Sequence, residues 1–232
     1  MAKATAVLED KSPTFMAIEL PVFTHVRVKL VGTAPLLTHA GGDGLAELLL
    51  NQQKEKALGK KKKDRAPQNP FEEFKKGFYP LMSGKEFPTV ELKVGESWPY
   101  LANTFTMLNR AFQCSLVEAM LVYGGFKTDA RRWIRPVGPQ YIPIKYDKVV
   151  LRQDVVRMAD KTPSPRFRPE FHNWSLEVEI AYRKNSMPDP KSFWSLAIDA
   201  GNCVGIGDGR SIGLGRFDPV GIETKEIRNE GI

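Results

Sequence analysis

Two stretches of the chain alternate between apolar and polar side chains with a period of two, which is the pattern of a half-buried β-strand. In residues 23–31 the apolar positions are Val26, Val28 and Leu30, and the positions between them carry His25, Arg27 and Lys29. In residues 174–182 the apolar positions are Trp174, Leu176, Val178, Ile180 and Tyr182. Each stretch predicts a strand with one buried face, and the exposed face of the first strand is cationic.

Other stretches space their apolar side chains three or four residues apart, as one face of a helix does. The predicted helices cover residues 44–58, 70–78, 97–112 and 190–200. We predict that the second helix begins at Pro70 with Asn69 as its N-cap, because asparagine caps a helix N-terminus and proline suits the first helical position. We expect its stripe of Phe71, Phe74 and Phe78 to lie in the core. Gly201 is expected to end the last helix.

The order of these elements predicts the fold. The strand at 174–182 precedes a helix, a glycine-rich loop and a strand that begins at Phe217. This order is the second half of a ferredoxin-like βαββαβ unit, and the strand at 23–31 with the helix at 44–58 supplies its opening half. We therefore predict an α+β fold with a ferredoxin-like, RRM-like core. A flexible N-terminal arm over 1–20 would precede a single domain over 21–232, with large insertions at 54–69 and about 127–170.

Basic residues exceed acidic ones by 34 to 27, for a net charge of +7, and this surplus favours an anionic partner. Residues 54–65 contain the unbroken run Lys60–Lys63. Because these like charges repel one another and resist packing, we predict a flexible, exposed loop here. Residues 127–168 carry eleven Lys or Arg against four Asp. Both segments suit nucleic acid electrostatically, and ordinary solvated charge is the alternative interpretation.

Aromatic side chains are interleaved with the cations of residues 127–168, namely Trp133, Tyr141, Tyr146 and Phe167. Cations that meet phosphates and rings that stack on bases suit single-stranded nucleic acid. The alternative is that the rings belong to the core and the charges surround it. The candidate nucleic-acid contacts are Arg27, Lys29, Lys61, Lys62, Arg131, Arg132, Trp133, Arg135, Arg166, Phe167, Arg168, Arg210 and Arg216.

The glycine-rich loop follows the predicted helix at 190–200 and contains two Gly-hydrophobic-Gly units, Gly205-Ile-Gly207 and Gly213-Leu-Gly215. Glycine permits positive φ and close approach of another backbone, so the loop's amides are candidates to hold a phosphate or to pack on a neighbouring chain. A dinucleotide fingerprint would need glycine where Arg210 stands, and no Gly-Lys-Ser/Thr of a phosphate loop follows. The other interpretation is a flexible turn without a ligand.

This loop resembles the glycine-rich loop of the RAMP superfamily, written G-hydrophobic-G-x5-G-hydrophobic-G, and it matches from Gly205 to Gly215 without a gap. RAMP proteins are ferredoxin-like RNA-binding proteins of CRISPR systems, either backbone subunits that coat guide RNA or endoribonucleases that trim it. The resemblance implies a filament of subunits and a protruding thumb hairpin, for which residues 158–169 are the candidate. The segment Asn69-Pro70-Phe71-Glu72-Glu73-Phe74 is also similar to phage-borne relatives.

Catalytic chemistry has weaker support in the sequence. The resemblance implies a histidine after the first strand as general acid or base in the processing enzymes, and His39 is the only candidate at that place. No His, Cys and carboxylate cluster has zinc spacing, and we predict no metal and no cofactor. The expected function is therefore that of a non-enzymatic subunit that coats single-stranded RNA or DNA. The alternatives are a metal-independent endoribonuclease using His39 and a phage or bacterial structural protein that binds protein.

Cysteine content and hydropathy bear on where the protein works. Cys114 and Cys203 form neither a metal spacing nor a disulfide framework, which favours a reducing compartment. No apolar run reaches the roughly 20 residues that a membrane helix needs. We expect a cytoplasmic protein whose partners are single-stranded RNA or DNA, further copies of itself and other effector subunits, without a membrane.

Overall fold

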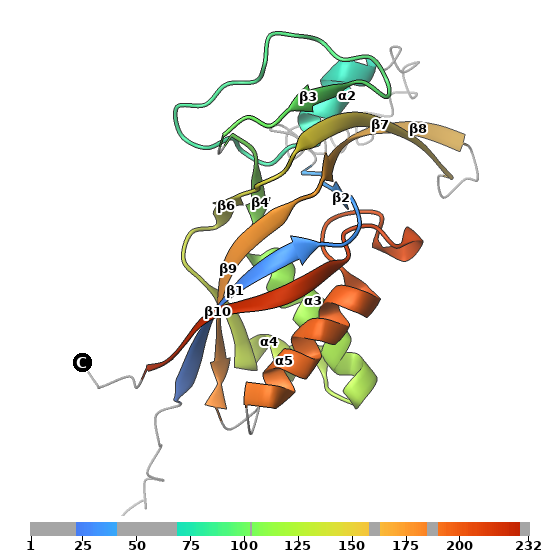
Figure 1. Cartoon of the computed structure of the whole chain (residues 1–232). Helices are drawn as coiled ribbons and strands as arrows, with labels where there is room; N and C mark the ends of the chain where they lie inside the picture. Colours follow the sequence, from blue (N-terminus) through green and yellow to red (C-terminus); the bar gives the residue numbers. More distant parts are fainter. Residues whose placement is uncertain (1–21, 41–68, 103, 158–162, 185–189, 228–232) are drawn as a thin grey trace, which may run out of the picture.

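A computed structural model describes residues 22–40, 69–102, 104–157, 163–184 and 190–227 of the chain (Figure 1). The predicted arm over 1–20, the helix at 44–58, and Lys61 and Lys62 lie outside these residues. Within them, three antiparallel sheets and four α-helices form a mixed α+β fold.

The first sheet has the strand order of a ferredoxin-like unit. Its neighbours run β10-β1-β9-β5, and every pairing is antiparallel. In chain order these are the fourth, first, third and second strands of a βαββαβ unit, so the predicted fold class is confirmed. The strands are β1 (Phe23–Gly32), β5 (Ile134–Val137), β9 (Ser175–Arg183) and β10 (Phe217–Ile227).

The central strand β1 alternates as its sequence predicts. Val26, Val28 and Leu30 are buried, whereas Arg27 is exposed between them. The pairing of β1 with β10 shifts register between Arg27 and Val28, which is a local bulge. One face of the sheet is therefore apolar, and the other carries the cations of β1.

Helices α3 (Arg110–Met120) and α5 (Pro190–Asp199) cover the apolar face of this sheet, and α4 (Lys127–Trp133) adjoins α3 (Figure 1). Phe112 and Leu116 of α3 and Phe193 of α5 are buried beneath them. The helix between the first and second strands of the unit is thus α3 with α4. In this structure α3 supplies the apolar face packed between β1 and β5 and leads through α4 into β5. Our prediction gave that position to residues 44–58, which lie outside the described residues.

A second sheet stands beside the first and is dominated by a long hairpin. Its order is β2-β8-β7-β3, and β7 and β8 pair without interruption from Lys148 opposite His172 to Arg157 opposite Pro163. The third sheet consists of β4 and β6 alone. The bounds are β2 (Leu36–Leu37), β3 (Ser97–Pro99), β4 (Thr106–Leu108), β6 (Tyr141–Pro143), β7 (Lys148–Arg157) and β8 (Pro163–His172).

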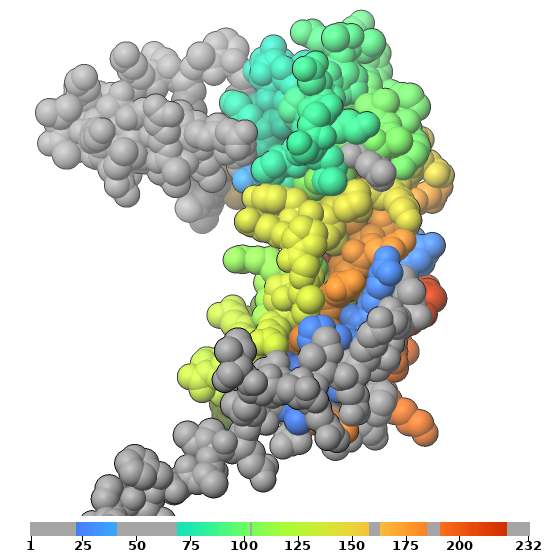
Figure 2. Space-filling model, turned by 90° about the vertical axis from the view of Figure 1, so that its left-hand side faces the viewer, coloured from blue at the N-terminus to red at the C-terminus, as the bar shows by residue number. Residues whose placement is uncertain are grey.

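Helix α2 (Pro70–Lys76) packs on this second sheet. The side chain of Asn69 accepts hydrogen bonds from the amides of Phe71 and Glu72, so the predicted cap is present. Phe71, Phe74 and Phe78 are buried in a cluster of rings around Trp98. Figure 2 shows this part of the chain, in teal and green, resting on the yellow segment around β6 and β7.

The predicted helix over residues 97–112 is wrong, because the segment forms β3, β4 and only the first turn of α3. Trp98 of β3 pairs with Val149 of β7, and residues 104–107 are all buried. Thr104 and Thr106 are buried together with Phe105 and Met107, so polar side chains do not mark an exposed face here and the pattern does not distinguish a strand from a helix. Here the ring cluster around Phe105 fixes the extended conformation.

Candidate nucleic-acid interface

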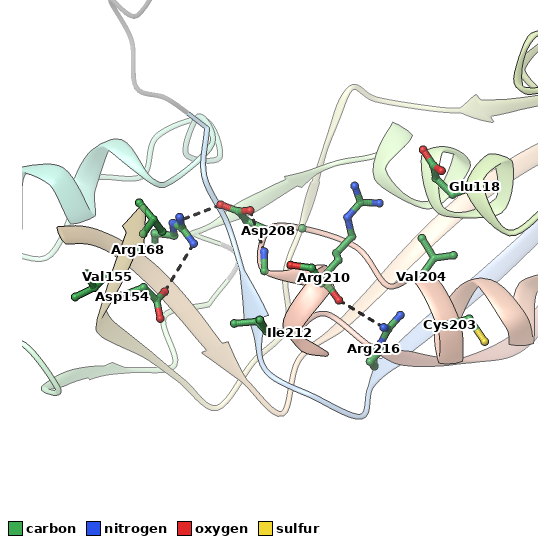
Figure 3. Close-up of a pocket in the computed structure, with 14 residues that line it drawn as sticks. Glu118, Asp154, Val155, Arg168, Cys203, Val204, Asp208, Arg210, Ile212 and Arg216 are labelled. Atoms are coloured by element: carbon green, nitrogen blue, oxygen red, sulfur yellow. Dashed lines mark hydrogen bonds and ion pairs between the residues drawn. The ribbon is translucent and has the colours of Figure 1, made fainter. Parts of the chain in front are cut away.

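The glycine-rich loop, residues 205–215, faces the β7–β8 hairpin across a hollow of about 860 Å³ (Figure 3). We call this hollow the arginine cleft. The hairpin contributes Asp154, Val155 and Arg168, and the loop side contributes Arg210, Ile212 and Arg216. The cleft therefore lies between the ferredoxin-like unit and the second sheet, near the start of β10.

Backbone hydrogen bonds fix the loop to the segment that follows β1. The amide of Gly215 donates to the carbonyl of Pro35 at 2.8 Å, and the amide of Asp208 donates to that of Leu37 at 2.9 Å. Within the loop, the amide of Ile206 donates to the carbonyl of Gly215 at 2.9 Å. These bonds clamp both ends of the loop and position its exposed arginines.

The glycines are required by backbone crowding at this clamp. Gly215 has φ 68°, and a Cβ on it would lie 1.8 Å from the carbonyl oxygen of Ile206. Gly207 has φ 77°, and its Cβ would lie 2.3 Å from the carbonyl oxygen of Leu37. Any other residue would meet both the left-handed conformation and a steric conflict.

Several amides of the loop are engaged within the protein, which bears on the expectation that they hold a phosphate. The amides of Gly205, Gly213 and Gly215 donate to the carbonyls of Ala200, Arg210 and Pro35. Amides already bonded to carbonyls are not available to an anion without breaking those bonds. The amides of these three glycines are therefore not candidates, and the arginine side chains are the cationic groups of this loop that suit an anion.

The carboxylates that line the arginine cleft are already paired with cations. Arg168 lies 3.4 Å from Asp208 through Nε and 3.7 Å from Asp154 through Nη1, and Glu118 bridges to Lys127 at 2.8 Å. These pairs neutralise the acids of the cleft locally, and the Arg168–Asp208 pair also links the hairpin to the loop (Figure 3).

Arg210 and Arg216 supply the remaining positive charge. Arg210 is exposed, and its guanidinium forms no ion pair or hydrogen bond with the described residues. Arg216 is half-buried and donates from Nη2 to the carbonyl of Arg210 at 3.5 Å. Two guanidinium groups that face a concave surface form a favourable environment for phosphate oxygens.

Exposed apolar side chains flank these cations, which the sequence interpretation did not identify. Ile212 of the loop is 66% exposed, and Val155 of the hairpin is 68% exposed. Both line the arginine cleft. Alternation along β7 places Val155 on one face, but only the three-dimensional pairing places that face opposite the loop.

His39 lies beside the cleft. Burial lowers its pKa, Asp208 opposes this effect, and Arg168 and Arg166 reinforce it. The imidazole is therefore neutral at pH 7. Among the described residues no side chain holds the His39 ring by a hydrogen bond or ion pair, whereas an efficient general base has an orienting partner.

The cations predicted on the open face of the first sheet are separate from the arginine cleft. Arg27 bridges to Glu177 at 2.8 Å, and Lys145 bridges to the same carboxyl at 2.8 Å. The hydrogen bond from Lys145, with the charges of both cations, lowers the pKa of Glu177 against the opposing effect of burial. Two cations of this face thus share one carboxyl group, and Lys29 stands beside Glu177 in the strand register.

Arg131 and Arg132 are exposed on α4, and Arg132 lies 3.6 Å from Asp129. The guanidinium of Arg135 lies 3.9 Å from the ring centroid of Phe23, as a cation–π contact. The structure does not bring these residues to the glycine-rich loop, which lies at the opposite end of β1 from Phe23. They do not form one continuous groove with Arg210 and Arg216.

The predicted stacking rings are largely core residues. Phe167 is 8% exposed, Tyr146 is 4% exposed, and Trp133 is half-buried against the core. A base cannot reach the face of a buried ring, so the stacking role assigned to Phe167 is wrong in this structure. Its neighbours Arg166 and Arg168 alternate to the other, polar face of β8, where Arg168 enters the cleft.

Comparison with known proteins adds one structural similarity. No family model matches the chain, and no curated protein matches it. Among the solved structures, 46 chains match. One belongs to the cryo-EM structure of the Type III-B Cmr-beta bound to cognate target RNA, with a TM-score of 0.41 and 12% identity over 89% of this chain and 61% of that chain. The chain thus spans less than two thirds of this neighbour's length, and the fold assignment rests on its own strand topology.

Three further observations concern the described residues only. None of their helices has the length and apolar character to cross a bilayer. No group of three or more His, Cys, Asp or Glu side chains is arranged to hold a metal ion in the described ranges. Cys114 and Cys203 are both exposed and free.

Proposed function

We propose that this protein binds single-stranded nucleic acid, RNA or DNA, in the arginine cleft. The observation that carries the proposal is the pairing state of the cleft's charges. Its carboxylates are engaged by Arg168 and Lys127, whereas Arg210 and Arg216 present guanidinium groups to the hollow. Two such groups suit the phosphates of one strand, because guanidinium donors match phosphate oxygens in geometry and charge.

The apolar side chains at the cleft favour a single strand over a duplex. Ile212 and Val155 are exposed on its two sides, and unstacked bases can pack on such groups while a paired duplex keeps its bases inside. Phosphate contacts would supply most of the affinity, so binding should weaken steeply as salt rises. The resemblance of the glycine-rich loop to RAMP proteins agrees with an RNA-binding role beside other subunits.

The proposal is tested by fluorescence anisotropy with labelled single-stranded RNA, single-stranded DNA and duplex of equal length, each at low and high salt. We expect salt-sensitive binding to at least one single strand and weaker binding to the duplex. Equal binding of all three at high salt would refute the proposal. Light scattering on the same samples tests the second part of the interpretation, that subunits associate head to tail into a filament as they coat the strand.

Two alternatives have their own measurements. An endoribonuclease would rely on His39, which lies beside the cleft and whose pKa is lowered by burial. Cleavage of RNA by the parent, lost in His39→Ala while strand binding persists, would establish that activity. A structural protein that binds protein predicts no anisotropy change with any oligonucleotide, in either salt condition.

A further inference from the structure

A second hollow, of about 730 Å³, lies between helix α2 and the small sheet of β4 and β6. We call it the tyrosine pocket. Tyr79, Tyr141 and Arg110 line it together with Lys75, Lys76 and Gln140. Its size falls within the roughly 300–1,000 Å³ that is usual for small-molecule sites. Tyr141 and Gln140 come from the basic segment 127–168, whereas Tyr79 and Arg110 were not among the candidate nucleic-acid contacts, and the glycine-rich loop contributes no lining residue.

The two tyrosines form a half-buried aromatic surface. Their ring centroids lie 6.2 Å apart with the planes tilted by 40°, and both side chains remain partly accessible. Burial, and then the neighbouring Tyr141, raise the pKa of the Tyr79 hydroxyl, so this hydroxyl is uncharged at neutral pH. Neutral rings that stay accessible in a concave site are suited to a flat aromatic ligand.

One cation of the pocket has no internal partner. Lys75 bridges to Glu72 at 2.6 Å, and Lys76 bridges to Glu73 at 2.9 Å. Arg110 is exposed and forms no ion pair with the described residues, and its charge acts on the Tyr79 hydroxyl. A guanidinium next to an aromatic surface suits a ligand that contains both an anionic group and a ring, because the guanidinium can bind the anion while the tyrosines contact the ring.

The pocket also offers hydrogen-bonding groups. The amide of Gln140 donates to the Tyr141 hydroxyl at 3.4 Å, which is a long bond and leaves a donor and the carbonyl oxygen for other partners. An amide that both donates and accepts can bond the edge of a heterocyclic base. The tyrosine rings, Arg110 and the Gln140 amide thus match three features of a nucleotide, namely the face of the base, the phosphate and the hydrogen-bonding edge of the base.

We propose that the tyrosine pocket binds one nucleotide, with the base against Tyr79 and Tyr141 and the phosphate at Arg110. The ligand is either a free nucleotide or one unit of a bound strand. Asp208 lines the arginine cleft, and its charge also acts on Tyr79. Ala40, which follows His39 in the chain, lines the tyrosine pocket, so the two hollows are neighbours. A strand that leaves the arginine cleft past His39 would reach the tyrosine pocket next.

The first test measures free nucleotides by calorimetric titration of the full chain with AMP, GMP, CMP and UMP, and with adenosine. Tyr141→Ala should weaken binding about 5- to 150-fold, since a stacked base is worth about 1–3 kcal/mol. Tyr141→Phe keeps the ring and should bind as the parent does. Arg110→Gln should weaken AMP but not adenosine, because adenosine lacks the phosphate. Arg210→Glu, in the other hollow, should leave these affinities unchanged.

The second test identifies the source of the nucleotide. RNA and DNA strands that carry a photoreactive base are cross-linked to the protein, and the modified peptides are sequenced. Cross-links at Tyr79 or Tyr141 without binding of free nucleotides would assign the pocket to a unit of the strand. Absence of both, or mononucleotide affinities unchanged in Arg110→Gln and Tyr141→Ala, would overturn the proposal. If Tyr141→Ala does not fold, the exposed Arg110→Gln variant decides.

The two proposals can fail separately. Loss of strand binding in Arg210→Glu with intact mononucleotide binding supports both sites. A parent that binds AMP through the tyrosine pocket but binds no strand would remove the function proposed for the arginine cleft alone. A parent that binds strands through Arg210, with neither mononucleotide affinity nor cross-links in the pocket, would remove only this further inference.

Discussion

Replacing Gly215 by alanine tests whether the glycine-rich loop is a backbone clamp. The added Cβ would lie 1.8 Å from the carbonyl oxygen of Ile206, in a residue whose φ is 68°. The matched control is Gly213→Ala, because Gly213 has φ 86° but no atom lies within 4 Å of a Cβ there. Both variants therefore acquire backbone strain, and only one acquires a steric conflict.

The magnitudes follow from these contacts. The left-handed conformation costs a non-glycine residue about 1–2 kcal/mol, and Gly213→Ala should lose that much unfolding free energy. Gly215→Ala also displaces the bonds from Gly215 to Pro35 and from Ile206 to Gly215, of 2.8 and 2.9 Å. Each such bond contributes about 0.5–1.5 kcal/mol. The Gly215 variant should therefore lose about 1–3 kcal/mol more than its control.

The assay is thermal unfolding of the parent and both variants under one condition. A loss of 1 kcal/mol lowers Tm by about 2–4 °C in a protein of this size, so the Gly215→Ala midpoint should fall about 2–12 °C below that of Gly213→Ala. Equal midpoints for the two variants would refute the clamp. They would mean that the loop relaxes freely and that its glycines serve something other than close packing.

Two further predictions concern single charges. Asp208→Asn removes a carboxylate from the arginine cleft and releases Arg168, so strand binding should tighten and log K should fall more steeply with log salt, by about 0.7 per added phosphate contact; weaker binding in anisotropy would contradict this. Glu177 has its pKa lowered from 4.5 by Lys145 and Arg27. Its contribution to stability is thus present above pH 4.5 and lost as pH falls through the lowered folded pKa. The Tm difference between parent and Glu177→Gln should vanish at that acidic end, and a difference independent of pH would exclude the linkage.

Much of the fold was predictable where one face of an element is polar. The alternation in β1 and β9 and the cap at Asn69 all correspond to the structure. The wrong prediction at residues 97–112 concerns a segment that is buried around Phe105. Periodicity needs polar side chains to be exposed and apolar ones buried, and Thr104 and Thr106 are buried like the apolar residues beside them.

The candidate site was predictable in part for a similar reason. Sequence spacing identified Arg210 and Arg216 with their loop, because glycine clusters and cations are local features. Sequence could not show that Phe167 turns into the core while Arg168 turns to the cleft, since that depends on which face of β8 packs inward. Tyr79 and Arg110 come from distant segments, and only the packing of the segment after α2 against β4 and its neighbourhood brings them together.

The most direct test of the account compares the salt dependence of strand binding in Arg210→Glu and Arg183→Glu. Both substitutions reverse one exposed arginine, but Arg183 pairs with Phe23 at the opposite end of the sheet from the loop. We expect weaker binding for Arg210→Glu, with a slope of log K against log salt that is shallower by about 0.7, and parental behaviour for Arg183→Glu. Equal effects of the two reversals would contradict it, because they would show that only net charge matters and that the arginine cleft is not the binding site.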